Sequence, residues 1–328
     1  MGQESSILVT GAEGFIGSHV VEVLAKSGIR VRALCQYNSF GSIGWLGELS
    51  TEFSDNVEIV FGDVRDADQM RRYVRGCSSV VNLAALIAIP YSYLAGRSYA
   101  DVNTIGTLNL LEAVRENRIR MIQISTSEIY GTPQTTPITE LHPVNPQSPY
   151  AASKAAADHF VMSYYDSFDM DLLIVRPFNT YGPRQSSRAV IPTILSQLVF
   201  GAPTLRIGSL TAKRDFTFVS DTAEAIAKAI NSDVQGEIIQ LGTGSAVSVL
   251  ELIEMCQSIC GTNIEVVEDL QRIRPKKSEV EILLSDPSKA MDYLEWQSRV
   301  DLHSGLEQTR NWIENNPNAF RDFQNYRI

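Results

Sequence analysis

The feature that most constrains the fold is an apolar run, Ile7–Val9, that leads directly into a glycine-rich turn. The turn reads TGAEGFIG over residues 10–17, and apolar residues then recur up to Leu24 at the spacing of one helical face. Glycines in such a turn let a pyrophosphate approach the backbone, and the start of the helix offers free N–H groups and a positive dipole end. A strand, a turn and a helix in this order predict a dinucleotide-binding unit.

Short apolar runs continue to alternate with longer amphipathic ones up to about residue 175. This rhythm is typical of βαβ units around a parallel sheet. The predicted strands are 7–10, 30–34, 57–60, 80–83, 121–125 and 172–175. We therefore expect an α/β fold with a Rossmann-type doubly wound parallel sheet, to which the chain returns near residues 238–241.

Beyond Asn179 the pattern is less regular, because prolines interrupt shorter elements. The length of 328 residues favours about two domains. We expect a dinucleotide-binding domain over residues 1–178, with a later return near 215–245. Residues 179–328 would mainly form a smaller C-terminal substrate-binding domain.

Composition narrows the possible partners and locations. The formal net charge of -10 argues against a broad phosphate-binding surface, so we expect no nucleic-acid partner. No apolar run approaches the roughly 20 residues that span a bilayer, and the first residues lack a basic signal region. A cytoplasmic protein without a membrane partner is expected. The four cysteines lack paired CxxC spacing, so no metal site is predicted.

The end of the second predicted strand bears on the choice of cofactor. Many NAD-binding chains carry an acid there for the adenosine ribose, but this chain has Gln36 and no obvious arginine nearby. The choice between NAD and NADP therefore stays open. Asp63 is expected to meet the adenine or to cap a helix. The candidate cofactor-binding residues are Gly11, Gly14, Phe15, Ile16, Gly17, Gln36, Asn38, Ser39, Asp63, Val64, Leu83, Ala84, Ala85, Tyr150 and Lys154.

Tyr150 and Lys154 lie four residues apart in a strongly helix-forming run that begins with Ser148 and Pro149. They therefore share one helical face. A lysine ammonium beside a phenol stabilises the phenolate, as a general base that removes a hydroxyl proton requires. Alone, such a pair is most often a surface pair, but together with the glycine turn it predicts proton transfer at a substrate hydroxyl.

The glycine turn and the Tyr150–Lys154 pair together resemble the extended short-chain dehydrogenase/reductase family over nearly the whole chain. NTYGPRQ at 179–185, RDFTFVSD at 214–221 and Arg274–Pro275 are similar to signatures of its sugar-nucleotide branch. The resemblance implies that Tyr150 takes the proton of the sugar 4-hydroxyl while a hydride passes from C4 to a tightly bound NAD or NADP. It also implies that Lys154 holds the nicotinamide ribose.

The segment that separates the reactions of this branch is Ser125–Gly131, at the end of the fifth predicted strand. Once C4 is a ketone, the C5 proton is acidic, and a carboxylate such as Glu128 can remove it before the C6 hydroxyl leaves as water. The resemblance implies that Thr126 hydrogen-bonds the 4-hydroxyl. Glucose-nucleotide dehydratases carry Asp where this chain has Ser127, whereas GDP-mannose 4,6-dehydratases are similar in having Ser-Glu.

The expected activity is therefore a nucleotide-sugar 4,6-dehydratase, a lyase, with Thr126, Ser127, Glu128, Tyr150 and Lys154 as catalytic residues. The alternatives are a 4-epimerase or a UDP-glucuronate decarboxylase and, more remotely, a non-catalytic dinucleotide sensor. Residues 37–46, 84–93 and 274–281 resemble legionaminic-acid-pathway dehydratases that act on GDP-N-acetylglucosamine. This likeness implies an N-acetylhexosamine nucleotide and leaves UDP or GDP open.

Planar guanidinium groups hold diphosphates through paired hydrogen bonds, which makes several later residues candidates for the nucleotide sugar. The resemblance implies that Asn179, Arg214 and Arg274 contact the diphosphate and that Glu279 lies near the nucleoside. The remaining candidate substrate-binding residues are Arg188, as a further cation, and Ala88, Tyr91 and Tyr93 for the hexose. By analogy with relatives, the predicted helices 99–116 and 151–167 would pair across a twofold axis, so a homodimer is expected.

Overall fold

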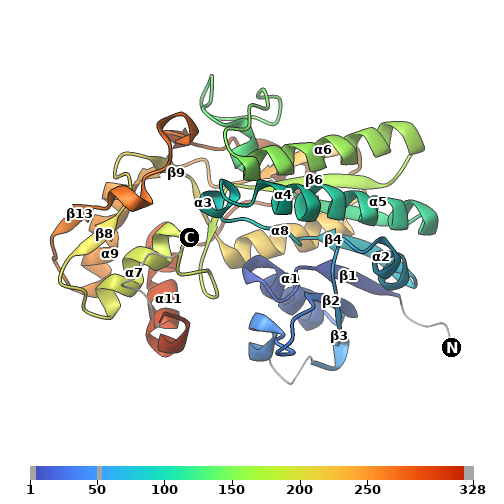
Figure 1. The fold of residues 1–328 in the computed structure, drawn as a ribbon, viewed down its shortest axis with the longest axis horizontal. Helices are drawn as coiled ribbons and strands as arrows, with labels where there is room; N and C mark the ends of the chain where they lie inside the picture. The colour runs from blue at the N-terminus through green and yellow to red at the C-terminus, as the bar shows by residue number, and fades with distance from the viewer. Residues whose placement is uncertain (1–4, 50–53, 321–328) are drawn as a thin grey trace.

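The computed structural model describes residues 5–49 and 54–320, and it centres on a seven-stranded parallel sheet (Figure 1). The strand order is β11-β6-β5-β4-β1-β2-β3. The strands are β1 Ser6–Thr10, β2 Val31–Gln36, β3 Val57–Gly62, β4 Cys77–Asn82, β5 Arg120–Ile124, β6 Leu172–Pro177 and β11 Glu237–Leu241. The six predicted strands and the predicted return of the chain to the sheet are confirmed.

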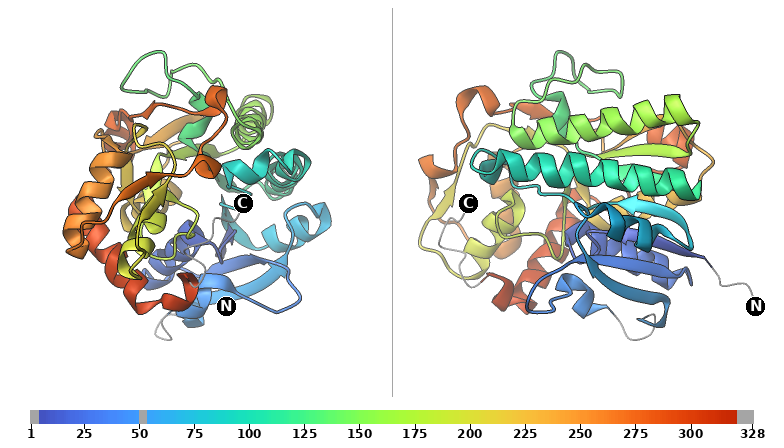
Figure 2. Two further views of the ribbon diagram at one scale, coloured as in Figure 1. Left: turned by 60° about the vertical axis from the view of Figure 1, so that its left-hand side comes forward. Right: turned by 45° about the vertical axis from the view of Figure 1, so that its right-hand side comes forward.

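Helices cover both faces of the sheet, as a doubly wound fold requires (Figures 1 and 2). One face packs against α1 and α8, and the other packs against α2, α5 and α6. These helices are α1 Phe15–Lys26, α2 Ala67–Val74, α5 Gly106–Asn117, α6 Pro149–Phe168 and α8 Val219–Asn231. Apart from the edge strand β3, whose Glu58 and Ile59 are exposed, the strands are largely buried, which explains their mostly apolar sequences.

The later part of the chain builds a third apolar cluster beside the sheet, on the left in Figure 1. It is formed mainly by α7 Val190–Val199, α9 Val249–Cys260 and α11 Leu302–Asn315. Small sheets accompany them, ordered β10-β7, β12-β9-β14 and β13-β8. Their strands are β7 Asn179–Tyr181, β8 Leu205–Ile207, β9 Lys213–Arg214, β10 Phe216–Phe218, β12 Val247–Ser248, β13 Val266–Glu268 and β14 Ile282–Leu283. The proposed division at residue 178 stays a prediction.

The predicted helix over 99–116 differs from the observed structure. After α4 Gly96–Tyr99 the chain forms a π-helical stretch, Ala100–Ile105, before α5 begins. Asn103, inside this stretch, accepts from the Leu86 N–H at 2.8 Å and donates to the Leu86 carbonyl at 3.0 Å. The widened turn therefore lets one side chain satisfy the backbone of the loop that follows β4.

Helix α6 begins as its sequence predicts, since Ser148 Oγ accepts from the Ala151 N–H at 3.1 Å and Pro149 occupies the first turn. A buried ion pair then holds α6 on the sheet: Arg176 Nη2 of β6 lies 3.0 Å from Asp158 Oδ2, with side chains only 3% and 4% exposed. Ser125 also donates to Asp158, at 2.7 Å.

The same guanidinium reaches further across the sheet. Arg176 Nη1 donates to the Tyr130 hydroxyl at 2.8 Å, and that hydroxyl also accepts from Gln240 Nε2 at 2.6 Å. Because Gln240 lies on β11, one polar network joins α6 to the neighbouring strands β6 and β11. Each side chain in this network satisfies a buried donor or acceptor of its neighbour, so loss of one would leave another unsatisfied.

We predict that Arg176→Gln lowers the free energy of unfolding by about 3–5 kcal/mol, because it removes the ion-pair partner of the buried Asp158 carboxylate. Urea unfolding followed by circular dichroism measures the loss. Arg97→Gln is the matched control, since Arg97 forms an exposed pair with Asp101, and it should leave stability nearly unchanged. Equal effects of the two substitutions would show that the buried pair does not anchor α6.

Candidate active site

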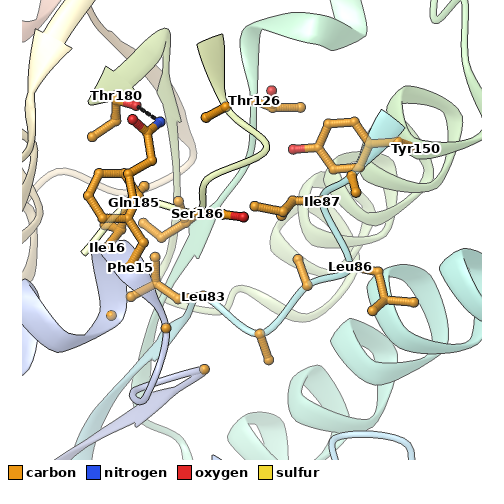
Figure 3. Close-up of a pocket in the computed structure, with 18 of the residues that line it drawn as sticks. Phe15, Ile16, Leu83, Leu86, Ile87, Thr126, Tyr150, Thr180, Gln185 and Ser186 are labelled. Carbon is orange, nitrogen blue, oxygen red and sulfur yellow. Dashed lines mark hydrogen bonds between the residues drawn. The ribbon is translucent and has the colours of Figure 1, made fainter. Parts of the chain in front are cut away.

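A cavity of about 830 Å³ opens at the carboxyl ends of the sheet strands (Figure 3). Gly11, Leu83, Ser125 and Phe178, which follow four different strands, all contribute to its wall. In open α/β sheets this edge is where ligands bind, because the strand order reverses there and leaves a crevice. Figure 3 shows Phe15 and Ile16 toward one side of the cavity and Tyr150 toward the other.

Most of the candidate residues meet in this cavity. Those that line it are Gly11, Gly14, Phe15, Ile16, Gly17, Gln36, Asp63, Val64, Leu83, Ala84, Ala85, Ala88, Tyr91, Thr126, Glu128, Tyr150, Lys154, Asn179, Arg188 and Arg274. The cavity wall does not include Asn38, Ser39, Tyr93, Ser127, Arg214 and Glu279.

The glycine turn forms one end of the cavity and fits a dinucleotide. Gly11 has a φ of +63°, and a Cβ on Gly17 would lie 2.1 Å from the Gly11 carbonyl oxygen, so the turn leaves no room for side chains. Gly14 begins α1 without a side-chain cap. The first turn of α1 therefore presents N–H groups to an anion such as a pyrophosphate.

Tyr150 and Lys154 lie on the same side of α6 and both line the cavity. In Figure 3 the Tyr150 hydroxyl points toward Thr126. Burial raises the pKa of Tyr150, the Thr126 hydroxyl lowers it, and the charge of Glu128 raises it further. A nearby cation is therefore needed before Tyr150 can act as a base.

Lys154 lies one helical turn beyond Tyr150 on α6 and lines the same cavity. Its Nζ donates to the Ile124 carbonyl at 2.5 Å. Burial lowers the pKa of Lys154 to about 8, while the negative charge of Asp158 opposes this shift. Asp158 lies one helical turn beyond Lys154, so the ion pair that anchors α6 also supports the ammonium group.

Glu128 stands in a group of four charges at the substrate end. It lies 3.5 Å from Arg274, and Arg214 lies 3.3 Å from Glu279. Burial lowers the pKa of Arg214, although Glu128 acts in the opposite direction. For Arg274 the burial effect is outweighed, because Glu128 and Glu279 raise its pKa. Arg214 and Glu279 are thus linked to the cavity through Glu128 and Arg274.

Other candidates are engaged outside the cavity wall. Ser127 is only 2% exposed, and the Tyr93 hydroxyl lies 2.6 Å from Ser278 Oγ. The Asn38 amide donates to carbonyls of its own turn, at Gln36 and Ser42, and Ser39 is exposed. Asp63 does line the cavity, but its carboxylate is bound by Arg65, which lowers its pKa.

Three neighbours of the site were not identified from the sequence. Asp158 follows Tyr150 and Lys154 at the same helical spacing, and that spacing was the available signal. Trp45 lines the cavity and stacks edge-on against Trp312 of α11 with ring centroids 5.3 Å apart. Glu13, within the glycine turn, also lines the cavity. Nothing in the sequence near Trp45 or Glu13 indicates these contacts, which only the fold creates.

Residues 5–49 and 54–320 lack two features. No group of three or more His, Cys, Asp or Glu side chains in this part of the chain is arranged to hold a metal ion. In the same residues no helix has the length and apolar character needed to cross a membrane.

Known proteins similar to this chain include both nucleotide-sugar 4,6-dehydratases and 4-epimerases. A family described as GDP-mannose 4,6 dehydratase matches residues 8–309. A putative UDP-glucose 4-epimerase of Methanocaldococcus jannaschii is 32% identical over 320 residues, covering 94% of this chain and 99% of the relative. A dTDP-glucose 4,6-dehydratase of an Actinoplanes species is 32% identical over 319 residues, covering 94% and 98%.

A solved structure has the same fold over nearly the whole chain. The dTDP-glucose 4,6-dehydratase DesIV of Streptomyces venezuelae, crystallised with NAD bound, superimposes with a TM-score of 0.86 at 29% identity. The superposition covers 95% of this chain and 98% of that one. The predicted Rossmann-type fold is therefore confirmed.

We predict that Lys154 loses its proton near pH 8, well below the ordinary lysine value of about 10.4. Carbon NMR of lysines labelled at Cε, titrated with pH, would show one resonance with this midpoint, and Lys154→Met would remove it. Asp158→Asn should move the midpoint to lower pH, because the carboxylate that favours the ammonium is gone. A lysine spectrum in which every midpoint exceeds pH 9.5, roughly, would contradict the assignment.

Proposed function

Because the chain belongs to the GDP-mannose 4,6-dehydratase family, we propose that it is a 4,6-dehydratase of UDP- or GDP-N-acetylglucosamine. The family match confirms the predicted nucleotide-sugar branch of the short-chain dehydrogenases, and with it an NAD(P)-dependent enzyme. The narrower likeness to the legionaminic-acid-pathway enzymes stays a prediction, as does the identity of the base.

The observation that carries the proposal is the presence of Glu128 in one cavity with Tyr150, Lys154 and Thr126. Oxidation at C4 requires a base for the hydroxyl proton, which is the role proposed for Tyr150 with the Lys154 ammonium nearby. Dehydration requires a second base for the C5 proton. Glu128 follows β5 on the short helical turn Ser127–Tyr130, and Thr126 Oγ1 accepts from its N–H at 3.2 Å.

The proposed reaction divides the proton transfers between these residues. Bound NAD(P) would supply the acceptor for hydride from C4 and return that hydride to C6. Tyr150 takes the proton of the 4-hydroxyl, with Thr126 hydrogen-bonded to the same oxygen. Glu128 removes the C5 proton, which the C4 ketone makes acidic, and the C6 oxygen leaves as water. A proton from solvent is then added at C5, balanced by the proton that Tyr150 releases, and the product is a 4-keto-6-deoxy sugar.

The C6 oxygen needs a proton to leave as water. Glucose-nucleotide dehydratases carry Asp at the position of Ser127, so Ser127 has to be considered as the donor. Ser127 is buried outside the cavity wall, so its hydroxyl is poorly situated to reach substrate. This favours Glu128 as the group that carries the C5 proton to the C6 oxygen. Ser127 would then act by supporting the turn on which Glu128 sits.

The substrate diphosphate is assigned to the cationic end of the cavity. Asn179, Arg188 and Arg274 line it, and Arg214 lies behind Arg274 in the same charge group. Guanidinium groups suit a diphosphate because their N–H groups form paired hydrogen bonds. Ala88 and Tyr91 lie on the wall that we assign to the hexose, with Tyr93 and Glu279 next to it.

We also expect a homodimer built on α5 and α6, which lie side by side on one outer face (Figure 2). Three apolar side chains on or next to these helices are partly exposed: Ile105 at 44%, Phe160 at 37% and Phe168 at 47%. Such side chains gain free energy when a second copy removes them from water. This assembly is a proposal that light scattering can test.

The first functional prediction concerns the product. Incubation with UDP- or GDP-N-acetylglucosamine in deuterated water should give a product lighter by one water before deuterium is counted, labelled at C5. Mass spectrometry and NMR of the purified sugar read both features. A C4-inverted product, as an epimerase would give, or a decarboxylated product from another sugar, with no loss of water from either nucleotide, would falsify the proposal.

The second functional prediction separates the two bases. Tyr150→Phe should lower turnover at least about 100-fold yet leave the cofactor bound, since it removes only the hydroxyl. Glu128→Gln should slow deuterium entry at C5 by a similar factor, whereas Glu268→Gln, an exposed acid on β13, should behave as the parent chain. Deuterium entry at the parent rate in Glu128→Gln would mean that another base removes the C5 proton.

A further inference from the structure

We propose that Glu13 makes this chain select NAD over NADP, by accepting hydrogen bonds from the hydroxyls of the adenosine ribose. The inference concerns the cofactor end of the cavity and rests on the NAD(P) dependence of the proposed function. In this chain the carboxylate for the ribose would come from the glycine turn, because the end of β2 carries Gln36 in place of an acid.

The fold brings the Glu13 side chain to the end of β2. Its Oε1 accepts from the Gln36 N–H at 2.8 Å, and both residues line the cavity. A dinucleotide whose pyrophosphate sits at the start of α1 places its adenosine ribose near the end of the second strand. The carboxylate therefore occupies the place usually filled by an acid on the strand itself.

A second segment holds Glu13 in this position. The Trp45 N–H donates to the Glu13 carbonyl at 3.1 Å, and a Cβ on Gly44 would lie 2.9 Å from the Glu13 Cβ. Gly44 has a φ of +54°, which glycine adopts without strain. Its lack of a side chain also leaves space for Glu13. The side chain is thus fixed between β2 and the short helical segment Gly44–Glu48.

One oxygen of this carboxylate has an unused acceptor. Oε2 of Glu13 is buried and has no hydrogen-bond partner among residues 5–49 and 54–320. A buried carboxylate oxygen without a donor is unfavourable, and such groups are normally satisfied by a partner or a ligand. The 2′- and 3′-hydroxyls of NAD are donors of the required kind, and charged acceptors form the stronger hydrogen bonds.

NADP carries a phosphate in place of the 2′-hydroxyl, which removes a donor and adds negative charge beside Glu13. The cations that the described part of the chain places on the cavity wall are Lys154, Arg184, Arg188 and Arg274. Arg184 is already paired with Glu22 at 3.1 Å and Glu48 at 3.4 Å. Lys154 belongs to the proposed catalytic group, and Arg188 and Arg274 are assigned to the substrate diphosphate. We therefore assign none of the four to a 2′-phosphate at Gln36.

The test is equilibrium binding of NAD and NADP to the full chain stripped of cofactor, without substrate. Quenching of tryptophan fluorescence reports binding, because Trp45 lines the cavity. The parent chain should bind NAD at least about tenfold more tightly than NADP. Glu13→Gln, which keeps the side-chain length, should weaken NAD about tenfold and strengthen NADP.

Two further variants make the outcome decisive. Glu58→Gln removes one negative charge from an exposed position on β3 and should leave the affinity ratio unchanged. Glu13→Asp keeps the charge but withdraws the carboxylate, so NAD should weaken while NADP does not strengthen; it also serves if Glu13→Gln fails to fold. Equal or tighter binding of NADP by the parent, or an unchanged ratio in both Glu13 variants, overturns the proposal. Because no substrate is present, failure here is distinct from failure of the dehydration assay.

Discussion

The ion pair between Asp158 and Arg176 lies inside the molecule and joins α6 to β6 of the sheet. Removing one partner leaves an uncompensated charge where water cannot reach it, so the two side chains hold α6 in one place. Tyr150 and Lys154 are carried on that helix, and Asp158 also favours the charged form of Lys154. A single buried carboxylate thus links the geometry of the catalytic helix to the charge on its lysine.

The end of the cavity that we assign to the substrate contains two pairs of opposite charges. Two carboxylates, Glu128 and Glu279, share their surroundings with the guanidinium groups of Arg214 and Arg274. Each charge is partly neutralised in the free protein, which limits the cost of holding four charges at reduced exposure to water. In the proposed reaction, the substrate diphosphate would attract these guanidinium groups and weaken their interaction with Glu128, the proposed C5 base.

Much of this arrangement was predictable because it depends on local spacing. Three features each involve only residues that are close together in the sequence: the glycine turn, the Ser148–Pro149 helix start and the four-residue separation of Tyr150 and Lys154. Contacts between distant segments were not predictable in this way. Glu13 meets Gln36 only after β1 and β2 pair, and Trp45 meets Trp312 across more than two hundred residues.

The sequence by itself therefore determined the α/β fold class, the strands of the sheet and the residue types that carry the chemistry, because helical and strand periodicity are properties of neighbouring residues. Tertiary structure alone decided which of those residues share a cavity. It brought Arg274 within 3.5 Å of Glu128, kept Ser127 out of the cavity wall, and brought a carboxylate from the glycine turn to the end of β2. The physical reason is that a charge acts on what lies near it in space, and only the packing of helices on the sheet sets those distances.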